Sequence, residues 1–207
     1  MAWLVRNYDL VIVATWEHLM LTIETVVIAL AISLAIGILA ARHPLVYRLA
    51  VTTTGMFYTI PSLALFALLV PVAGLGRVPA LIGLVGYSLL ALVRNIVTGL
   101  RGVPPEVVEA AVGMGCSRGQ ILMRVELPLA LPVIVAGIRV ATVTVIGIGT
   151  VAAYVNAGGV GALILSGIQQ TNTAKIAAGA VVATAMAWGA DYGLERVRRW
   201  LAPGAKA

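Results

Sequence analysis

The strongest constraint on the fold is a series of apolar runs, each about as long as a helix that crosses a bilayer. Of the 207 residues, 61% are hydrophobic and only 11% are charged, a composition too apolar for a soluble domain of this size. The runs occupy residues 19–41, 49–71, 78–100, 131–154 and 176–194, each near the twenty or so residues that a transmembrane helix needs. We therefore expect an all-α polytopic membrane protein with about five transmembrane helices.

Charge and reactive side chains exclude several other classes. The net charge is +6, but the basic residues are spread over short loops, so no nucleic-acid partner is expected. Cys116 is the only cysteine, and the two histidines are separated by an apolar run, so we expect neither a disulfide nor a metal site. The sequence contains no G-x-x-x-x-G-K-[ST] phosphate loop, so this chain should not bind ATP in the usual way.

The basic residues also predict the orientation in the membrane. Most lie in the loops after the first and third runs and after the fifth run, whereas Arg6, Arg77 and Lys175 lie on the opposite side. The positive-inside rule then places the N-terminus outside and the C-terminus in the cytoplasm. Residues 1–18 would form an external or interfacial segment, residues 19–200 the transmembrane domain and residues 201–207 a cytoplasmic tail. The glycine-rich stretch 154–173 suits a re-entrant or interfacial segment better than a sixth span.

The cytoplasmic loop at residues 102–126 carries signals for two short helices. Pro105 and Glu106 favour a helix start, and the first helix should run over residues 105–114. Gly115 is suited to a left-handed stop. Ser117 and Gln120 have the spacing of a capping box that restarts a helix towards residue 126. The loop is therefore expected to form an elbow of two helices.

Small side chains give this elbow a low profile. Ala110, Ala111 and Gly113 would let another protein pack closely against it. Composition alone equally allows a solvated loop between helices that contacts no partner.

Two sets of motifs resemble known transport proteins. Glu109-Ala110-Ala111, followed by Gly115 and closed by Leu127-Pro128, resembles the EAA signature of ABC-importer permeases. Residues 58–65, 87–95, 126–139 and 157–161 resemble osmoprotectant permeases, which import glycine betaine, carnitine or choline. The likeness extends over about residues 37–168, most of the chain.

The resemblance implies an architecture and a set of partners. It implies the type I, methionine-importer-like permease fold with a cytoplasmic coupling helix, in a bacterial or archaeal cytoplasmic membrane. Two ATPase subunits, a second permease chain that is identical or homologous, and an extracytoplasmic substrate-binding protein would complete the transporter. This chain would be a non-catalytic subunit without a cofactor of its own, because the ATPases bind Mg-ATP. The expected ATPase-coupling residues are Glu106, Glu109, Ala110, Ala111, Gly113, Met114, Gly115, Cys116 and Ser117.

Polar and aromatic residues around a proline are candidates for the translocation pathway, because quaternary amines bind aromatic rings through cation–π attraction. Interfacial anchoring or helix packing would explain the same residues without a pathway. The candidates are Tyr58, Thr59, Pro61, Ser62, Tyr87 and Asn156.

Three charges fall inside apolar runs. At about 1.5 Å per residue, Arg94, Arg139 and Asp191 share a depth towards the cytoplasmic side, so we expect an intramembrane charge cluster or inner gate. The alternative is that both arginines reach the headgroups as anchors. Glu24, near the outer end of the first run, would face solvent or a docked binding protein.

These features together predict the permease subunit of an osmoprotectant ABC importer. An ABC permease for another small solute, such as an amino acid, would show the same elbow. A channel or scaffold subunit of another class would have no ATPase partner.

Overall fold

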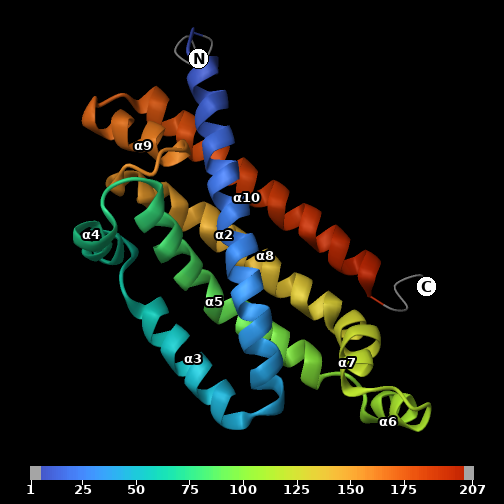
Figure 1. Ribbon diagram of the computed structural model, residues 1–207. Helices are drawn as coiled ribbons and strands as arrows, with labels where there is room; N and C mark the ends of the chain where they lie inside the picture. Colours follow the sequence, from blue (N-terminus) through green and yellow to red (C-terminus); the bar gives the residue numbers. More distant parts are fainter. Residues whose placement is uncertain (1–5, 203–207) are drawn as a thin grey trace.

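The computed structural model describes residues 6–202, and these form an all-helical bundle (Figure 1). Its order along the chain is α2 (Tyr8–Arg42), α3 (Pro44–Thr59), α4 (Ser62–Ala73), α5 (Arg77–Arg101), α6 (Pro105–Gly113), α7 (Arg118–Ile121), a π-helical turn (Leu122–Glu126), α8 (Leu127–Val151), a 3-10 turn (Ala152–Val155), α9 (Val160–Gln169) and α10 (Thr173–Leu201).

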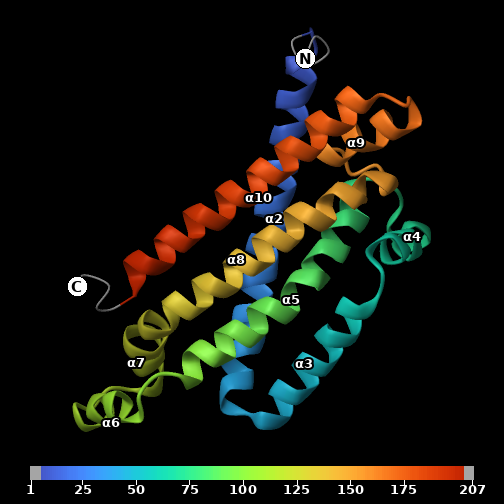
Figure 2. The same cartoon turned by 180° about the vertical axis from the view of Figure 1, so that it is seen from behind.

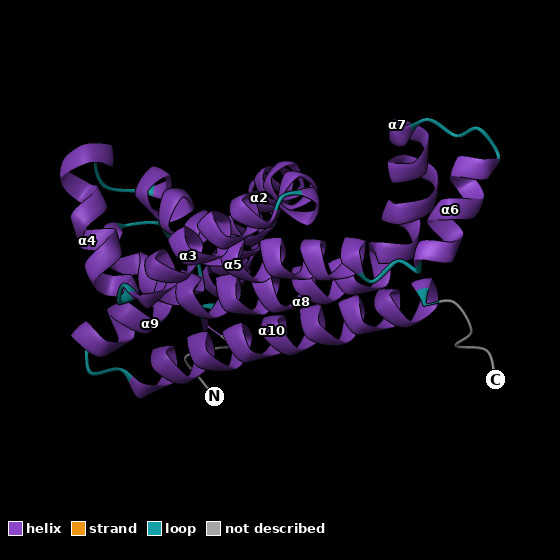
Figure 3. Ribbon diagram, turned by 90° about the horizontal axis from the view of Figure 1, so that it is seen from below, coloured by secondary structure: helices purple, strands orange, loops and turns teal. Residues whose placement is uncertain are grey.

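Four described helical stretches are long and apolar enough to cross a membrane, and the bent pair α3–α4 would make a fifth. Helix α2 runs along the bundle in front of the other helices in Figure 1, and Figure 2, seen from behind, shows α5, α8 and α10 side by side in front of it. Seen from below, α6 and α7 stand apart from the bundle at one end (Figure 3). The predicted all-helical membrane architecture is therefore confirmed.

Individual spans agree with the sequence to different degrees. The third and fifth predicted runs lie within α5 and α10, and the fourth ends in the 3-10 turn after α8. Helix α2 begins at Tyr8, so no helix boundary separates residues 8–18 from the first span. Residues 1–5 of the expected N-terminal segment and residues 203–207 of the expected tail lie outside the described residues.

The second span is not one straight helix. It breaks at Ile60 and Pro61, and α3 and α4 meet at 98°. Pro61 cannot donate a backbone hydrogen bond, and a residue before proline avoids helical geometry; Ile60 accordingly has an extended ψ of 128°. The hydroxyl of Tyr87 donates a hydrogen bond to the Ile60 carbonyl, which satisfies an acceptor freed by the break.

The core lies between α2, α5 and α8, and small residues let their backbones approach. A side chain at Gly37 of α2 would place its Cβ 2.5 Å from Cγ2 of Ile96 on α5. Phe66 is fully buried and holds α4 against Ala80 and Leu84 of α5. Close approach at small residues is the usual way for helices to associate in a membrane, where burial of apolar surface does not drive contact.

Helix α9 follows the glycine-rich segment and has ten residues. At about 1.5 Å per residue it is roughly 15 Å long, about half the thickness of a hydrocarbon core. It is therefore too short to form a sixth span by itself.

Candidate functional site

The elbow formed by α6 and α7 ends its first helix as the sequence predicts. Gly115 has a φ of +80°, its N–H donates to the Val112 carbonyl at 2.9 Å, and the Cys116 N–H donates to the Ala111 carbonyl at 3.1 Å. These paired bonds are the Schellman arrangement, which satisfies the last carbonyls of a helix through one left-handed residue. Any side chain at residue 115 would strain this turn.

The predicted capping box is also present. The Ser117 N–H donates to Oε1 of Gln120 at 2.8 Å, and the Gln120 N–H donates to Oγ of Ser117 at 3.4 Å. The second helix differs from the prediction, because it does not end near residue 126. It continues through the π-helical turn into α8, so that Arg118–Val155 is one continuous helical stretch. Pro128 lies in the first turn of α8, directly after the π-helical turn, so the continuous helix lacks one backbone donor at that point.

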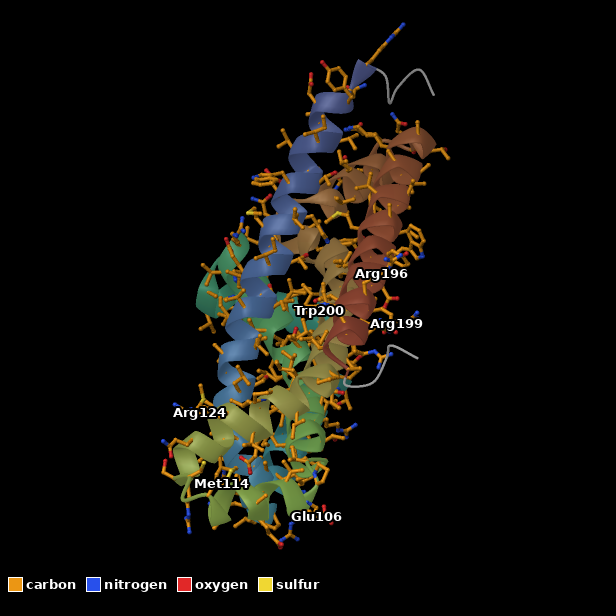
Figure 4. The ribbon with its side chains drawn as sticks, turned by 90° about the vertical axis from the view of Figure 1, so that its right-hand side faces the viewer. Glu106, Met114, Arg124, Arg196, Arg199 and Trp200 are labelled. Carbon is orange, nitrogen blue, oxygen red and sulfur yellow. The ribbon has the colours of Figure 1, made fainter. Side chains whose placement is uncertain are left out.

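The elbow exposes apolar side chains at the end of the molecule. Val112 and Met114 are 58% and 76% exposed, whereas Ala111 is only 1% exposed and packs inward. Figure 4 shows Met114 and Glu106 at this end of the molecule. Sequence analysis had not singled out Val112 or Met123, although exposed apolar residues in a polar loop are typical of a docking surface.

Two arginines tie the elbow and α5 to the end of α2. Arg42, the last residue of α2, forms an ion pair of 2.9 Å with Glu126 in the π-helical turn. Arg101 donates to the Ala40 and Ala41 carbonyls at 2.9 and 3.1 Å. The elbow therefore contacts α2 as well as continuing into α8.

The intramembrane charges form a network that only partly matches the prediction. Arg139 on α8 donates two hydrogen bonds to Asp191 on α10, at 2.5 and 2.8 Å. A third bond joins Arg139 to Glu195 at 2.7 Å, and Glu195 also binds Arg198 and Arg199. We call these five residues the α8–α10 charge network.

The predicted membership of Arg94 is wrong. Its side chain is exposed on α5, and it forms no ion pair with any residue in the range 6–202. Depth along a helix follows from the rise per residue, but the direction of a side chain around the helix depends on packing. The third residue that contacts this cluster directly is instead Glu195 on α10, which accepts from Arg139.

The pathway candidates on α3, α4 and α5 meet at the helix break. Tyr87 is 3% exposed and lies edge-on to Tyr58, with ring centroids 5.8 Å apart. Thr59 uses its hydroxyl on the Met56 carbonyl, while Pro61 and Ser62 begin α4. Tyr87 thus has a packing role, and a pathway through these residues stays a prediction.

Asn156 lies apart in sequence and has a local structural role. It ends the 3-10 turn after α8 with a φ of +64°, a left-handed conformation that asparagine tolerates better than most residues. Its side chain is exposed.

A contact between Glu17 and Gly159 at the opposite end of the bundle, which we call the Glu17 clasp, was not predicted from the sequence. A carboxylate oxygen of Glu17 on α2 accepts from the Gly159 N–H at 2.9 Å, directly before α9. The neighbouring His18 is 1% exposed, and its Nε2 lies 3.1 Å from the Ile146 carbonyl. A Cβ at Gly159 would lie 2.9 Å from Nδ1 of His18. The absence of a side chain at Gly159 therefore lets the start of α9 pack closely against α2 and α8.

Glu24 has a partner within the chain. Its two carboxylate oxygens receive bonds of 3.0 and 2.9 Å from Arg77 at the start of α5. This pair links the middle of α2 to the start of α5, on the side that sequence analysis placed outside, and both side chains remain partly exposed.

A bundle of apolar helices, one of them broken at a proline, with an elbow projecting from one end, defines a membrane-embedded transport component. The chain belongs to the family described as the binding-protein-dependent transport system inner membrane component, whose model matches residues 33–207.

Relatives with established names resemble nearly the whole chain. The carnitine transport permease protein OpuCB of Listeria monocytogenes is 36% identical over 97% of this chain and 92% of its own length. The osmoprotectant import permease protein OsmW of Salmonella typhimurium is 39% identical over 91% of this chain and 90% of its own. The choline transport system permease protein OpuBB of Bacillus subtilis is 35% identical over 91% and 87%.

The fold also has a counterpart among solved structures. The inward-facing MetNI methionine ABC transporter superposes with a TM-score of 0.82 and 23% identity, over 94% of this chain and 97% of that chain. The expected methionine-importer-like permease fold is therefore confirmed.

Proposed function

We propose that this chain is the permease subunit of a binding-protein-dependent ABC importer that takes up an osmoprotectant quaternary amine, such as glycine betaine, carnitine or choline. The observation that carries the proposal is the likeness over at least nine tenths of the chain to permeases named for carnitine, choline and osmoprotectants. The motifs at residues 58–65, at the helix break, and 157–161, beside Glu17, support it through their resemblance to osmoprotectant permeases.

The transporter would contain two permease chains, identical or homologous, two ATPase subunits that bind and hydrolyse Mg-ATP, and one external binding protein. The ATPases would bind the elbow through the exposed Val112 and Met114. The binding protein would dock at the opposite end, near α9. This assembly would lie in the inner membrane of a bacterium or archaeon. The N-terminus would be outside and the C-terminus in the cytoplasm, as the distribution of arginines favours.

Coupling in this scheme is mechanical. Because α7 continues into α8 without a loop, a displacement of the elbow moves α8 directly. The Arg42–Glu126 pair passes part of that displacement to α2. Closure of the ATPases on ATP would rock these helices and turn the pathway outward, a rigid-body transition that needs no covalent chemistry or cofactor in this chain.

The helix break and the charge network supply the moving parts. Tyr58 and Thr59 would line the pathway where α3 turns into α4, and Pro61 would keep the angle between them. The α8–α10 charge network would act as the inner gate. Arg139 has three hydrogen bonds to carboxylates, which favours a gate over the alternative in which this arginine only anchors to headgroups.

The test is ATP hydrolysis by the reconstituted transporter in lipid nanodiscs, with glycine betaine, carnitine, choline or an amino acid loaded on the binding protein. We expect a quaternary amine to stimulate hydrolysis. Gly115→Trp should abolish ATPase binding, whereas Gly74→Trp, at another positive-φ glycine with open space around it, should retain it.

The outcomes separate the parts of the proposal. Stimulation by an amino acid alone would overturn the substrate class and leave the importer intact. A well-folded chain that binds no ATPase would overturn the importer assignment and favour a channel or scaffold.

A further inference from the structure

The outward face of α10 carries a stripe of aromatic and basic side chains. Trp188, Tyr192, Arg196 and Arg199, which we call the α10 stripe, follow one another at steps of three or four residues and so share a helix face. The Trp188 and Tyr192 rings stack with centroids 5.9 Å apart. Arg196 lies 5.0 Å over the Tyr192 ring and also donates to its hydroxyl. In Figure 4, Arg196 and Arg199 project from the side of α10 that faces away from α2.

Positive charge exceeds negative charge at this end of α10. Arg139, Arg198 and Arg199 bind the two carboxylates of Asp191 and Glu195, and Arg196 adds a fourth positive charge. Arg196 has no carboxylate partner in the range 6–202. Arg199 uses only its Nε on Glu195, which leaves N–H donors of its guanidinium group available in a side chain that is 71% exposed. The site is therefore complementary to an anion.

The stripe joins a polar cavity to an apolar groove. Tyr192, Glu195, Arg196 and Arg199 line a cavity of about 380 Å³. Further along α10, a groove of about 420 Å³ is lined by Ala180, Val181, Thr184, Ala185 and Trp188. Residues 184 and 192 are roughly 12 Å apart along the helix at the usual rise. The stacked aromatic pair lies between the two.

We propose that α10 binds one anionic phospholipid of the cytoplasmic leaflet, with its phosphate on Arg196 and Arg199 and an acyl chain in the groove beside Trp188. Tryptophan and tyrosine commonly mark the boundary between acyl chains and headgroups, and arginines next to a transmembrane helix attract anionic lipids. A free phosphate would use the polar cavity but not the groove. This site goes beyond the proposed function, because it adds a lipid ligand that neither the elbow nor the substrate requires, although Arg199 also belongs to the α8–α10 charge network.

The test counts lipids bound to the purified full-length chain by native mass spectrometry, with dioleoyl phosphatidylglycerol or dioleoyl phosphatidylcholine added. We expect one phosphatidylglycerol to be retained in preference to phosphatidylcholine. Arg196→Gln should weaken this binding about fivefold, the effect expected of one arginine near a lipid surface. Arg48→Gln removes an exposed arginine of α3 on the same predicted side and should leave it unchanged.

A second variant tests the groove without touching the ion pairs. Trp188→Ala should weaken retention of both lipids, whereas Arg196→Gln should weaken that of phosphatidylglycerol alone. Equal retention of phosphatidylglycerol by Arg196→Gln and Arg48→Gln would overturn the proposal. So would complete displacement of the lipid by inorganic phosphate, which would indicate a site for a free anion. Loss of a lipid-independent dimer in Trp188→Ala would instead assign the face to a second copy of the chain.

Discussion

Gly161→Ala tests how closely α9 packs on α8. A Cβ at residue 161 would lie 2.1 Å from the Thr150 carbonyl oxygen and 2.7 Å from its carbonyl carbon. An ordinary carbon–oxygen contact is about 3.3 Å, so the two helices would have to separate by roughly 1 Å. The obstacle is the backbone of α8, and no rotation of a side chain can relieve the clash.

The free energy of this clash can be estimated from core overpacking, which costs about 1–3 kcal/mol. A contact with backbone belongs at the upper end of that range, and the better helix propensity of alanine offsets at most about 1 kcal/mol. We therefore expect a net loss of about 2 kcal/mol in the free energy of unfolding. For a chain of this length, that corresponds to a fall of about 4–8 °C in the unfolding midpoint.

The assay is thermal unfolding of the detergent-solubilised chain, followed by tryptophan fluorescence, with Gly147→Ala as the matched control. Gly147 is also helical, and nothing lies within 4 Å of its added Cβ, so this substitution should leave the midpoint unchanged or raise it. A Gly161→Ala chain that unfolds at or above the midpoint of Gly147→Ala would refute the close approach of α9 to α8.

Three further predictions follow from other parts of the molecule. Gly115→Ala forces a side chain into a positive-φ turn, so the folded end of α6 should become less stable by about 1 kcal/mol. Its backbone amides should then exchange faster with deuterium. Gly113→Ala, with open space around it, should slow that exchange. Asp191→Asn removes an anion from the α8–α10 charge network and should lower transport while assembly with the ATPase persists. Arg94→Gln removes no ion pair of this network, so it should not lower transport through a loss of the network. Glu17→Ala removes the acceptor for the Gly159 N–H and should lower the free energy of unfolding by about 1 kcal/mol, as for a lost helix cap. Glu17→Gln should lower it less, because it keeps an acceptor oxygen. The unfolding midpoint measures both effects.

Each of these has an outcome that would contradict it. Unchanged exchange in Gly115→Ala would mean that the elbow does not depend on its left-handed residue. A fully active Asp191→Asn transporter would remove the network from the gate. Equal midpoints for Glu17→Ala and the unchanged chain would show that the clasp contributes nothing to the position of α9.

The spans and the elbow were predictable because both depend on local sequence. A run of apolar residues has few alternatives to a helix in a membrane, since backbone polar groups must be satisfied within the segment. In the elbow, Gly115 and the Ser117–Gln120 pair specify their turns through bonds to residues three to five positions away. Local signals of this kind need no knowledge of the surrounding fold.

Contacts between segments far apart in the sequence were harder to predict. The Glu17 clasp joins residues 142 positions apart, and nothing near Glu17 in the sequence indicates Gly159. The second span looked like a single run because hydropathy measures composition and is insensitive to a 98° bend. Pro61 marks the place of the break, but the turn also depends on Tyr87 from α5, which donates to the Ile60 carbonyl.

The mismatch at the charge network shows how membrane depth and helix direction combine. Arg94 has the required depth, yet its exposed position on α5 keeps it out of the contact between α8 and α10. Glu195 is one turn beyond Asp191, and residues four apart on a helix face the same side, so both carboxylates reach Arg139. Because Glu195 is also bound by Arg198 and Arg199, the network connects the middle of α8 to the end of α10, where the lipid site is proposed. A lipid phosphate that draws Arg199 away from Glu195 would leave the Glu195 carboxylate freer to bind Arg139. The lipid and the inner gate would therefore compete for Arg199.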